Sequence, residues 1–295
     1  MKQPLYIIAG PTAAGKSALA VALAKKINGE VISGDSMQVY RGMDIGTAKI
    51  TPEEMEGVPH HLIDCVEPWE EWNVAKFVEL AREAIEDIAS RGRVPIVAGG
   101  TGFYLHALAY GAEFEPEETA SECRRALEAR AETEEGRAGL YDQLVAVDPA
   151  AAEAIHPNNI KRVIRALEYH LQTGGLISEH NKKLRAKESP YDLHFYVLNM
   201  DRARLYERID RRVDLMIESG LVEEVRGLRA KGCDRSLVSM QGLGYKEIIA
   251  YLEGEISLEE AVRVLKRDTR HFAKRQLTWF RREEATWVSS VNEIV

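Results

Sequence analysis

The sequence contains few cysteines and no long hydrophobic run. Its 295 residues include three cysteines, Cys65, Cys123 and Cys233, which stand far apart and form no Cys-x-x-Cys pair. This spacing argues against a zinc site or a disulfide framework and suits a reducing compartment. No apolar stretch approaches the roughly 18 residues of a membrane span. Since residues 1–10 also lack the build of a signal peptide, we expect a cytoplasmic protein without membrane contact.

An excess of basic residues is absent as well. The chain has 39 lysines and arginines against 47 acidic residues, which gives a formal net charge of −8. This balance argues against a general nucleic-acid binder, so any nucleic-acid contact has to use local basic faces. A hydrophobic content of 45% with 29% charged residues is ordinary for a globular protein. The length allows one large domain or a main domain with an insert.

The most informative stretch is a phosphate-binding loop near the start of the chain. Its sequence, GPTAAGKS, fits the pattern G-x-x-x-x-G-K-[ST] between an expected strand at residues 5–9 and a helix at 17–26. Backbone N–H groups of such a loop, together with the helix N-terminus and the lysine, bind phosphate, and the serine hydroxyl holds Mg²⁺. The sequence therefore predicts a site for a diphosphate-bearing molecule, formed by Gly10, Pro11, Thr12, Ala13, Ala14, Gly15, Lys16 and Ser17.

Two further loops follow predicted strands. Asp35 comes directly after a strand expected at residues 30–33, and the carboxyl ends of parallel strands share one sheet edge, so Asp35 should lie beside the phosphate loop. The alternative is that Asp35 only caps a helix beginning at Ser36 or Met37. Thr101 lies in a glycine-rich turn after a strand at residues 94–98. That turn either faces an anion or needs its glycines for backbone geometry alone.

Four charged or histidine positions carry weaker signals. Lys49 lies in a loop, where a solvated charge is the simpler interpretation. Asp64 ends a third predicted strand at residues 60–64, at the place of an NTPase magnesium aspartate, but only two apolar residues precede it. His60 and His61 are adjacent in that strand and would point to opposite faces, which disfavours a metal site.

Helical spacing without strand signals dominates from residue 111 to 190, and a fifth strand resumes the sheet at 193–199. We therefore predict an α/β fold, a nucleotide-kinase-like parallel sheet with a P-loop, flanked by helices and carrying an inserted all-helical subdomain. The catalytic core would comprise residues 1–110 and 191–295, and the insert residues 111–190.

Two helices present basic faces. On the helix predicted at residues 160–173, the positive charges lie off the apolar face; they are Lys161, Arg162 and Arg165, followed later by Lys182, Lys183, Arg185 and Lys187. The last helix, residues 258–280, has a basic stripe of Arg263, Arg267, Arg270, Lys274 and Arg281, flanked by Lys266. Such faces are either simply solvated or contact a phosphate backbone.

With these motifs in hand, the chain resembles the bacterial tRNA dimethylallyltransferase family, also called isopentenyl-tRNA transferases. The similarity spans nearly the whole chain, in the order of the family. Besides the phosphate loop, the matching stretches are GDSMQVY (34–40), IGTAK (45–49), PHHLID (59–64), AGGTGFYL (98–105), RVIRALE (162–168), GLGYKE (242–247) and KRDTRHFAKRQLTWF (266–280). Ala14 departs from a serine that is common in the family.

The resemblance implies transfer of a dimethylallyl group from dimethylallyl diphosphate to N6 of the adenosine at tRNA position 37, just 3′ of the anticodon. An aromatic amine is a weak nucleophile, so a carboxylate should take its proton, and Asp35 is our candidate. Lys16, the phosphate loop and Mg²⁺ held through Ser17 would stabilise the leaving diphosphate. Thr101, by family analogy, would hydrogen-bond near the reacting centre.

The same resemblance implies contacts to the anticodon stem-loop, whose target base would be flipped into the pocket. We expect Asp35, Ser36, Met37 and Gln38 to read the adenine edge. The further tRNA contacts that we predict are Thr101, Arg124, Asn159, Lys161, Arg162, Arg165, Gly244, Lys246, Arg270 and Lys274. We expect a monomer, and whether Asp64 or the last helix takes part in the site is left open.

Two other classes of function compete with this interpretation. A small-molecule or nucleotide kinase also places an aspartate beside a phosphate loop; it would consume ATP with Mg²⁺ and would not bind tRNA. An RNA-binding module with a purely structural anion site would bind RNA without turnover and tolerate Asp35→Ala.

Overall fold

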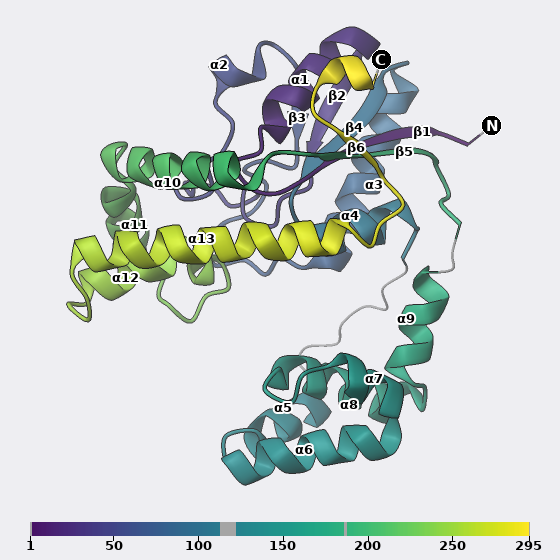
Figure 1. Cartoon of the computed structure of the whole chain (residues 1–295), viewed down its shortest axis with the longest axis vertical. Helices are drawn as coiled ribbons and strands as arrows, with labels where there is room; N and C mark the ends of the chain where they lie inside the picture. Colours follow the sequence, from purple (N-terminus) through teal and green to yellow (C-terminus); the bar gives the residue numbers. More distant parts are fainter. Residues whose placement is uncertain (1, 113–121, 186–187, 295) are drawn as a thin grey trace. The chain divides into compact units, whose positions relative to one another are not determined.

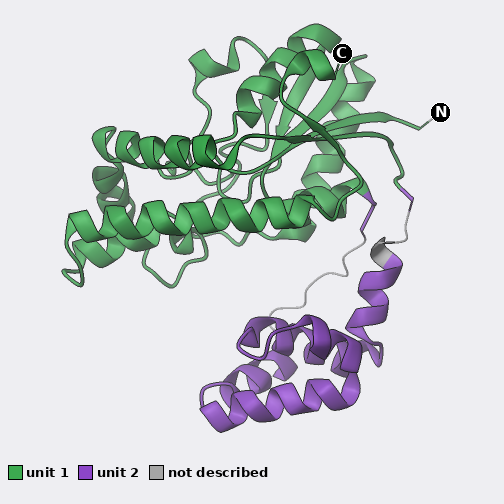
Figure 2. Ribbon diagram, viewed as in Figure 1, with its two compact units in different colours: residues 1–109, 189–295 green, residues 110–188 purple. Residues whose placement is uncertain are grey.

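The chain forms two compact units. The computed structural model describes residues 2–112, 122–185 and 188–294, with residues 184 and 185 described by their backbone alone. One unit comprises residues 1–109 and 189–295, and the other residues 110–188 (Figure 2). The second unit is therefore an insertion between the two sequence segments that form the first unit.

The larger unit is built on one parallel sheet, which confirms the predicted fold class. Its strand order is β3-β2-β4-β1-β5-β6, and all pairings are parallel (Figure 1). The strands are β1 (Pro4–Ala9), β2 (Gly29–Ser33), β3 (His60–His61), β4 (Val94–Gly99), β5 (Asp192–Leu198) and β6 (Thr286–Val288).

The central strands are continuous apolar runs because both faces of the sheet are covered. Ile8 of β1 and Ile96 of β4 belong to a core cluster with helix α1 (Lys16–Ile27), whose Leu19 and Leu23 are buried there. Val97 alternates with Ile96 and points to the other face, next to Leu105 of helix α4 (Gly102–Ala109). The loops after β1, β2 and β4 consequently lie side by side at one sheet edge.

Helices surround this sheet and extend beyond it. Helices α10 and α13 lie side by side, and α12 packs against α13 (Figure 1). The helices of this unit are α1 (Lys16–Ile27), α2 (Pro52–Met55), α3 (Val74–Ser90), α4 (Gly102–Ala109), α10 (Arg202–Glu218), α11 (Leu221–Ala230), α12 (Tyr245–Leu252) and α13 (Leu258–Phe280), with 3₁₀ turns η1 (Ser239–Gln241) and η2 (Val291–Glu293).

The smaller unit is helical and has its own core. Leu140, Leu144 and Leu167 are among its buried residues. Asp148 is also buried and accepts hydrogen bonds from Ala151 N and from Ser178, so that it fixes two helix starts at once. The helices are α5 (Glu122–Arg130), α6 (Glu134–Val147), α7 (Pro149–Ala154), α8 (Ile160–Thr173) and α9 (Ile177–Arg185).

Two predicted elements differ from the structure. The strand predicted at residues 60–64 is wrong in length, because only His60–His61 pairs, and Leu62 and Asp64 adopt left-handed φ values of 58° and 53°. Strand β6 was not predicted, since three residues are too few to show a period.

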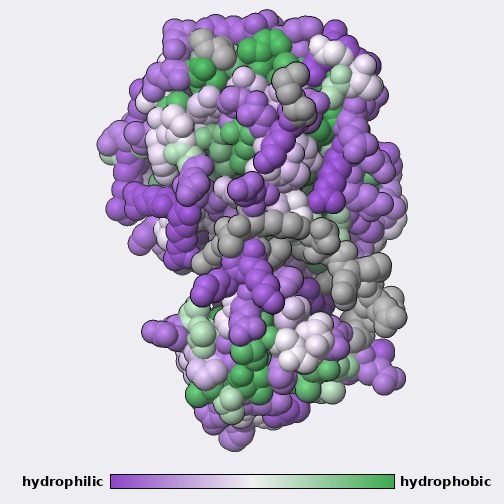
Figure 3. Space-filling view, turned by 90° about the vertical axis from the view of Figure 1, so that its right-hand side faces the viewer, coloured by the Kyte–Doolittle hydropathy of each residue, from purple (hydrophilic) through white to green (hydrophobic). Residues whose placement is uncertain are grey.

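No helix in the described part of the chain is both long and apolar enough to span a bilayer. The face in Figure 3 is mostly hydrophilic, with separate hydrophobic patches.

Candidate active site

The phosphate loop connects β1 to α1, as its motif requires. Gly10 and Gly15 have φ values of 147° and 103°, which a side chain would disfavour. Ala13 also lies in the left-handed region, at φ 62°, so the loop is held in a conformation that costs free energy. Helix α1 begins at Lys16, and its N-terminus therefore points into this loop.

Lys16 has an unusually acidic ammonium group. Loss of hydration, helped by the positive charge of Arg212, lowers the pKa of Lys16 to about 8, and the charge of Asp35 partly opposes this. Its Nζ donates a hydrogen bond of 2.9 Å to the carbonyl of Pro11. Lys16, Arg212 and Asp35 thus share one electrostatic environment, which the sequence analysis predicted for two of the three.

Two arginines of α10 donate hydrogen bonds to the phosphate loop, and the sequence analysis did not predict them. Arg208 Nε donates to the carbonyl of Ala13 at 2.8 Å, and Arg212 Nη1 donates to the hydroxyl of Thr12 at 3.0 Å. Burial lowers the pKa of Arg212. The two residues are four apart and share a helix face, but nothing in the local sequence relates that face to a loop about 200 residues earlier.

The loop after β2 carries Asp35 in a turn, not at the start of a helix. The alternative in which Asp35 caps a helix at Ser36 or Met37 is therefore wrong. One carboxylate oxygen, Oδ1, accepts a hydrogen bond of 2.8 Å from Met37 N, which fixes the orientation of the side chain. The negative charge of Asp35 raises the pKa of both Lys16 and Arg212, so Asp35 lies within electrostatic reach of these two cations.

Thr101 connects the loops that follow β2 and β4. Its Oγ1 accepts a hydrogen bond from Ser36 N at 3.3 Å and lies 3.4 Å from Ser36 Oγ. Gly34 N donates to the carbonyl of Ala98 at 2.8 Å, one step earlier along the same pair of strands. The structure thus brings Asp35, Thr101 and the phosphate loop to one sheet edge.

The remaining residues of the Asp35 loop have mainly structural contacts. The amide of Gln38 accepts a hydrogen bond from Ser33 Oγ at 3.3 Å and donates to the carbonyls of Thr47 and Ala48. Met37 packs close to Gly242, where an added Cβ would lie 2.5 Å from its Cε. Their assignment as adenine contacts stays a prediction.

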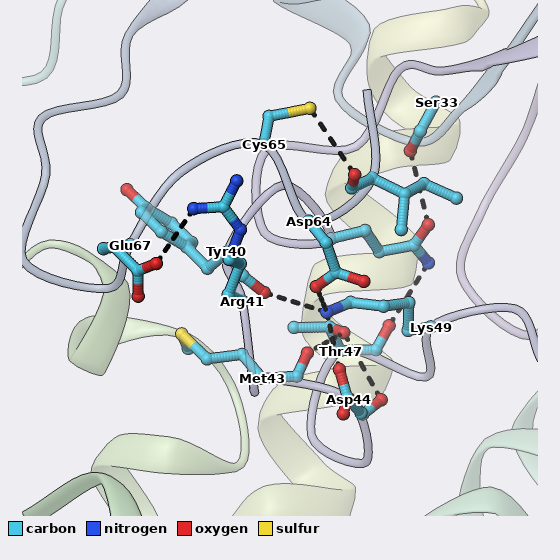
Figure 4. A network of polar contacts seen from close by, with 12 residues as sticks. Ser33, Tyr40, Arg41, Met43, Asp44, Thr47, Lys49, Asp64, Cys65 and Glu67 are labelled. Atoms are coloured by element: carbon cyan, nitrogen blue, oxygen red, sulfur yellow. Dashed lines mark hydrogen bonds and ion pairs between the residues drawn. The ribbon is translucent and has the colours of Figure 1, made fainter. Parts of the chain in front are cut away.

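Lys49 is buried and holds this region together (Figure 4). Its side chain is 6% exposed, so the interpretation as a solvated charge is wrong. Nζ donates to the carbonyl of Tyr40 at 2.8 Å and contacts carboxylate oxygens of Asp44 at 2.6 Å and Asp64 at 2.5 Å. Asp64 follows edge strand β3, with β2 and β4 between it and β1, which is remote from a metal site at the phosphate loop.

The carboxylate of Glu224 holds the loop at residues 44–46. The carboxylate of Glu224 accepts three backbone hydrogen bonds from this loop, at 2.9, 2.7 and 3.1 Å, and one from Tyr245 at 2.7 Å. Gly46 has no room for a side chain, because an added Cβ would lie 2.6 Å from the Tyr245 ring. Gly244 caps α12 through Glu247, and Lys246 lies 3.5 Å from that carboxylate.

The basic stripe of α13 is largely neutralised by acidic neighbours. Arg270 pairs with Asp210 of α10, and Lys266 pairs with Asp214 at 2.6 Å. Arg263 and Arg267 pair with acidic residues of their own helix. Lys274 is exposed and has no ion-pair partner within the described residues. Of these four ion pairs, those of Arg270 and Lys266 join α13 to α10. Because Arg270 is paired, Lys274 is the better candidate of the two predicted tRNA contacts on this helix.

The basic residues of the smaller unit fall into two groups. Arg124 and Arg165 contact the buried carboxylate of Glu168 at 2.8 and 3.2 Å. Asn159, Lys161 and Arg162 are exposed at the start of α8. Lys187 and the side chain of Arg185 lie outside the described residues. Lys161 and Arg162 of the exposed group therefore keep their positive charges available to a ligand.

The adjacent histidines, His60 and His61, make structural contacts beside the sheet. His61 Nε2 lies 2.7 Å from the buried carboxylate of Glu30, and His60 Nδ1 lies 2.8 Å from the carbonyl of Val58. Among the residues that the structure describes, no group of three or more His, Cys, Asp or Glu side chains is arranged to hold a metal.

Ser17 fits a magnesium ion that is carried mainly by its substrate. Its residue is exposed in the first turn of α1, and its hydroxyl has no hydrogen bond within the described part of the chain. Mg²⁺ commonly keeps several waters and binds through substrate phosphates with few protein ligands. A single hydroxyl beside a diphosphate loop suits that pattern.

The chain is similar to known families over most of its length. Residues 38–283 match the family described as IPP transferase, and residues 3–66 match isopentenyl transferase. A tRNA dimethylallyltransferase of Lachnoclostridium phytofermentans is 62% identical over 288 residues, covering 97% of this chain and 92% of the relative. One from Acetivibrio thermocellus is 52% identical over 286 residues, covering 97% and 91%.

Solved structures are similar as well. The tRNA isopentenylpyrophosphate transferase of Bacillus halodurans has a TM-score of 0.74 at 49% identity, covering 99% of this chain and 94% of that one. A eukaryotic dimethylallyltransferase acting on tRNA has a TM-score of 0.80 at 35% identity, covering 95% and 70%.

Proposed function

The chain belongs to the IPP transferase family of tRNA dimethylallyltransferases, and from this premise we propose how its own residues perform the reaction. The enzyme transfers the dimethylallyl group of dimethylallyl diphosphate to N6 of adenosine 37 in tRNA, giving N6-isopentenyladenosine and diphosphate. A bond forms between N6 and the first carbon of the allyl group, and the bond from that carbon to the diphosphate oxygen breaks. The residues at the sheet edge divide these two tasks.

Asp35 accepts the proton. Attack by N6 leaves a positive charge on a nitrogen that still holds a hydrogen, and a carboxylate within hydrogen-bond reach removes it as the bond forms. The hydrogen bond from Met37 N occupies Oδ1 of Asp35, which leaves Oδ2 for the substrate amine. Thr101 holds the same loop through Ser36 and offers its hydroxyl to the reacting centre.

The phosphate loop receives the leaving group. Negative charge grows on the diphosphate as the carbon–oxygen bond breaks, and Lys16 with the loop amides and the N-terminus of α1 is placed to stabilise it. Arg208 and Arg212 add two positive charges at the loop. Mg²⁺ held in part by Ser17 would supply further charge neutralisation of the diphosphate.

The anticodon stem-loop is the part of tRNA that we propose the enzyme recognises. The exposed group Asn159, Lys161 and Arg162 supports this, since a local basic face suits a phosphate backbone in an otherwise acidic protein. We further propose that the enzyme acts as a monomer in the cytoplasm. The absence of a bilayer-spanning helix among the described residues agrees with the proposed location.

The observation that supports this assignment best is the convergence of Asp35 with Lys16 and Arg212. Incubation with unmodified tRNA, Mg²⁺ and labelled dimethylallyl diphosphate should place label in the tRNA, and ATP in a parallel reaction should not be consumed. Lys16→Ala should abolish transfer because it removes the ammonium group that the phosphate loop itself supplies. ATP consumption without labelled tRNA would favour the kinase alternative instead.

A further inference from the structure

The side chain of Gln276 bridges two loops at the candidate site. Its Oε1 accepts a hydrogen bond of 2.8 Å from Thr12 N in the phosphate loop, and its Nε2 donates one of 2.9 Å to the carbonyl of Gly100. The residue is 6% exposed and projects from α13.

We infer that Gln276 is a positioning residue that sets the spacing between the diphosphate and the acceptor base. The inference rests on the proposed function, in which the phosphate loop holds the donor and the loop of Gly100 and Thr101 holds the acceptor. Neither substrate needs to touch Gln276 for this. It acts through the two loops that it joins.

The two loops need such a connection. Strands β1 and β4 are paired up to Ala9 and Gly99, and the ladder ends there. Beyond that point, no hydrogen bond directly joins residues 10–15 to residues 100–102 within the described chain. Gln276 replaces the missing ladder with two hydrogen bonds from a third element, so the loops keep a fixed separation.

A glutamine suits this place for a chemical reason. One loop presents an N–H group and the other a carbonyl, and a primary amide is a neutral side chain with both an acceptor and a donor. A glutamate would still accept from Thr12 but would repel the carbonyl of Gly100. A methionine would fill similar space and make neither hydrogen bond.

Gly100 provides an independent sign that the bridge is built in. A Cβ added at Gly100 would lie 2.3 Å from Gln276 Nε2, far inside contact distance. The glycine at this position therefore makes room for the amide, and Gly100→Ala should displace the bridge without altering Gln276 itself.

The helix that carries Gln276 is well anchored. Thr269, Ala273 and Phe280 are buried on the same helix, and α13 packs against α10, which carries Arg208 and Arg212. Thr12 thus receives a hydrogen bond from α10 at its hydroxyl and makes one to α13 from its amide. Both helices hold the tip of the loop from one side.

The test compares Gln276→Met with wild type in three measurements: the Kd of dimethylallyl diphosphate, the Kd of tRNA, and the single-turnover rate with both substrates saturating. A misplacement of reacting atoms by about 1 Å can cost about 100-fold in rate. We expect the rate to fall by about 10- to 100-fold and each Kd to change by less than about threefold. Gln276→Glu should lie between Gln276→Met and wild type.

Matched variants separate positioning from a loss of folding. Thr269→Val removes a buried polar group two turns away on the same helix and should keep the wild-type rate. Gly100→Ala should reproduce the loss, and adding it to Gln276→Ala should cost little more, because both changes break one bridge. A wild-type rate in Gln276→Met, or a loss explained by unfolded protein alone, would overturn the inference. A wild-type enzyme that transfers no label would instead refute the proposed function.

Discussion

Arg212 donates a hydrogen bond of 3.0 Å to the hydroxyl of Thr12, although 200 residues separate them in the chain. Because the phosphate loop is otherwise built from residues 10–17, this contact makes helix α10 part of the proposed diphosphate site. It also places a second positive charge close enough to Lys16 to lower the pKa of that lysine. Binding of an anion relieves the repulsion between these two cations, so the repulsion makes anion binding more favourable.

Arg212→Met should therefore weaken the binding of dimethylallyl diphosphate. We expect KM for this substrate to rise about 10-fold or more, because charge-assisted hydrogen bonds contribute roughly 1.5 to 3 kcal/mol. The KM for tRNA should change little. Thr12→Val, which removes only the hydroxyl, is the milder control, and equal KM values in Arg212→Met and wild type would contradict the role.

The acidity of Lys16 predicts a pH dependence of donor binding. Its pKa of about 8 in the folded protein means that the ammonium loses its proton as the pH rises through 8. The Kd of dimethylallyl diphosphate should therefore increase above about pH 8. Isothermal titration between pH 7 and pH 9.5 measures this dependence.

Arg212→Met provides the matched control for that titration. The charge of Arg212 lowers the pKa of Lys16, so its removal should move the rise in Kd to higher pH. A Kd that stays flat between pH 7 and pH 9.5 in wild type would show that Lys16 does not titrate in this range.

Lys16 should also cost stability in the protein without substrate. Its folded pKa is depressed from 10.5 to about 8, so the unfolded chain binds more protons between these values and stability rises with pH across that window. Lys16→Met should stabilise the free protein by roughly 1 to 3 kcal/mol at pH 7, after discounting for solvent at the site. Urea unfolding measures this, and a destabilised variant would argue against a strained ammonium.

Much of the fold followed from local pattern. The phosphate loop with the helix that follows it and the long helix α13 are motif-bearing or periodic segments, and the structure has them close to their predicted bounds. The two-residue strand β3 and the three-residue strand β6 could not be delimited, because pairing and backbone φ decide their ends. Periodicity requires several turns or alternations before it becomes visible.

The site was predictable where a motif carries it and unpredictable where distant segments meet. Asp35 and Thr101 come shortly after strands β2 and β4, and Lys16 ends the phosphate loop that follows β1, so sheet geometry and the loop motif together bring the three residues to one edge. Arg212 and Gln276 reach the same loop from helices that begin about 190 or more residues later, and their neighbours in sequence say nothing of this. Lys49 was misjudged because its three partners become its neighbours only after folding.

Glu30 is predicted to stabilise the fold without affecting catalysis. Hydrogen bonds from Arg91 lower its pKa to about 2, with His61 contributing in the same direction. This stabilisation is complete above the unfolded pKa of 4.5 and is lost as the pH falls toward 2. Glu30→Gln should cost about 1 to 3 kcal/mol at pH 7 and about half as much or less near pH 3.

Denaturant unfolding at the two pH values tests the role of Glu30. The control is Glu56→Gln, which breaks an exposed pair with Lys25 and should cost under about 1 kcal/mol. Equal unfolding midpoints for wild type and Glu30→Gln at pH 7 would contradict the assignment.

Arg162 and Arg124 should respond differently to removal. Arg162 is exposed, so Arg162→Ala should weaken tRNA binding and reduce its salt dependence by about one phosphate contact. Arg124 neutralises the buried Glu168, so Arg124→Ala should mainly destabilise the helical unit. Filter binding across salt concentrations, alongside thermal unfolding, measures both, and an unchanged salt slope in Arg162→Ala would remove that helix from the interface.

The single-turnover rate of Asp35→Asn tests the central claim most directly. Asparagine keeps an oxygen for the hydrogen bond from Met37 N but is not a base, so the loop should stay in place while proton transfer fails. With labelled dimethylallyl diphosphate and unmodified tRNA both saturating, we predict a rate about 100- to 10,000-fold below wild type and a tRNA Kd within a few-fold of it. A wild-type rate in Asp35→Asn, or a loss of tRNA binding at an unchanged rate, would contradict the account of Asp35 as the proton acceptor.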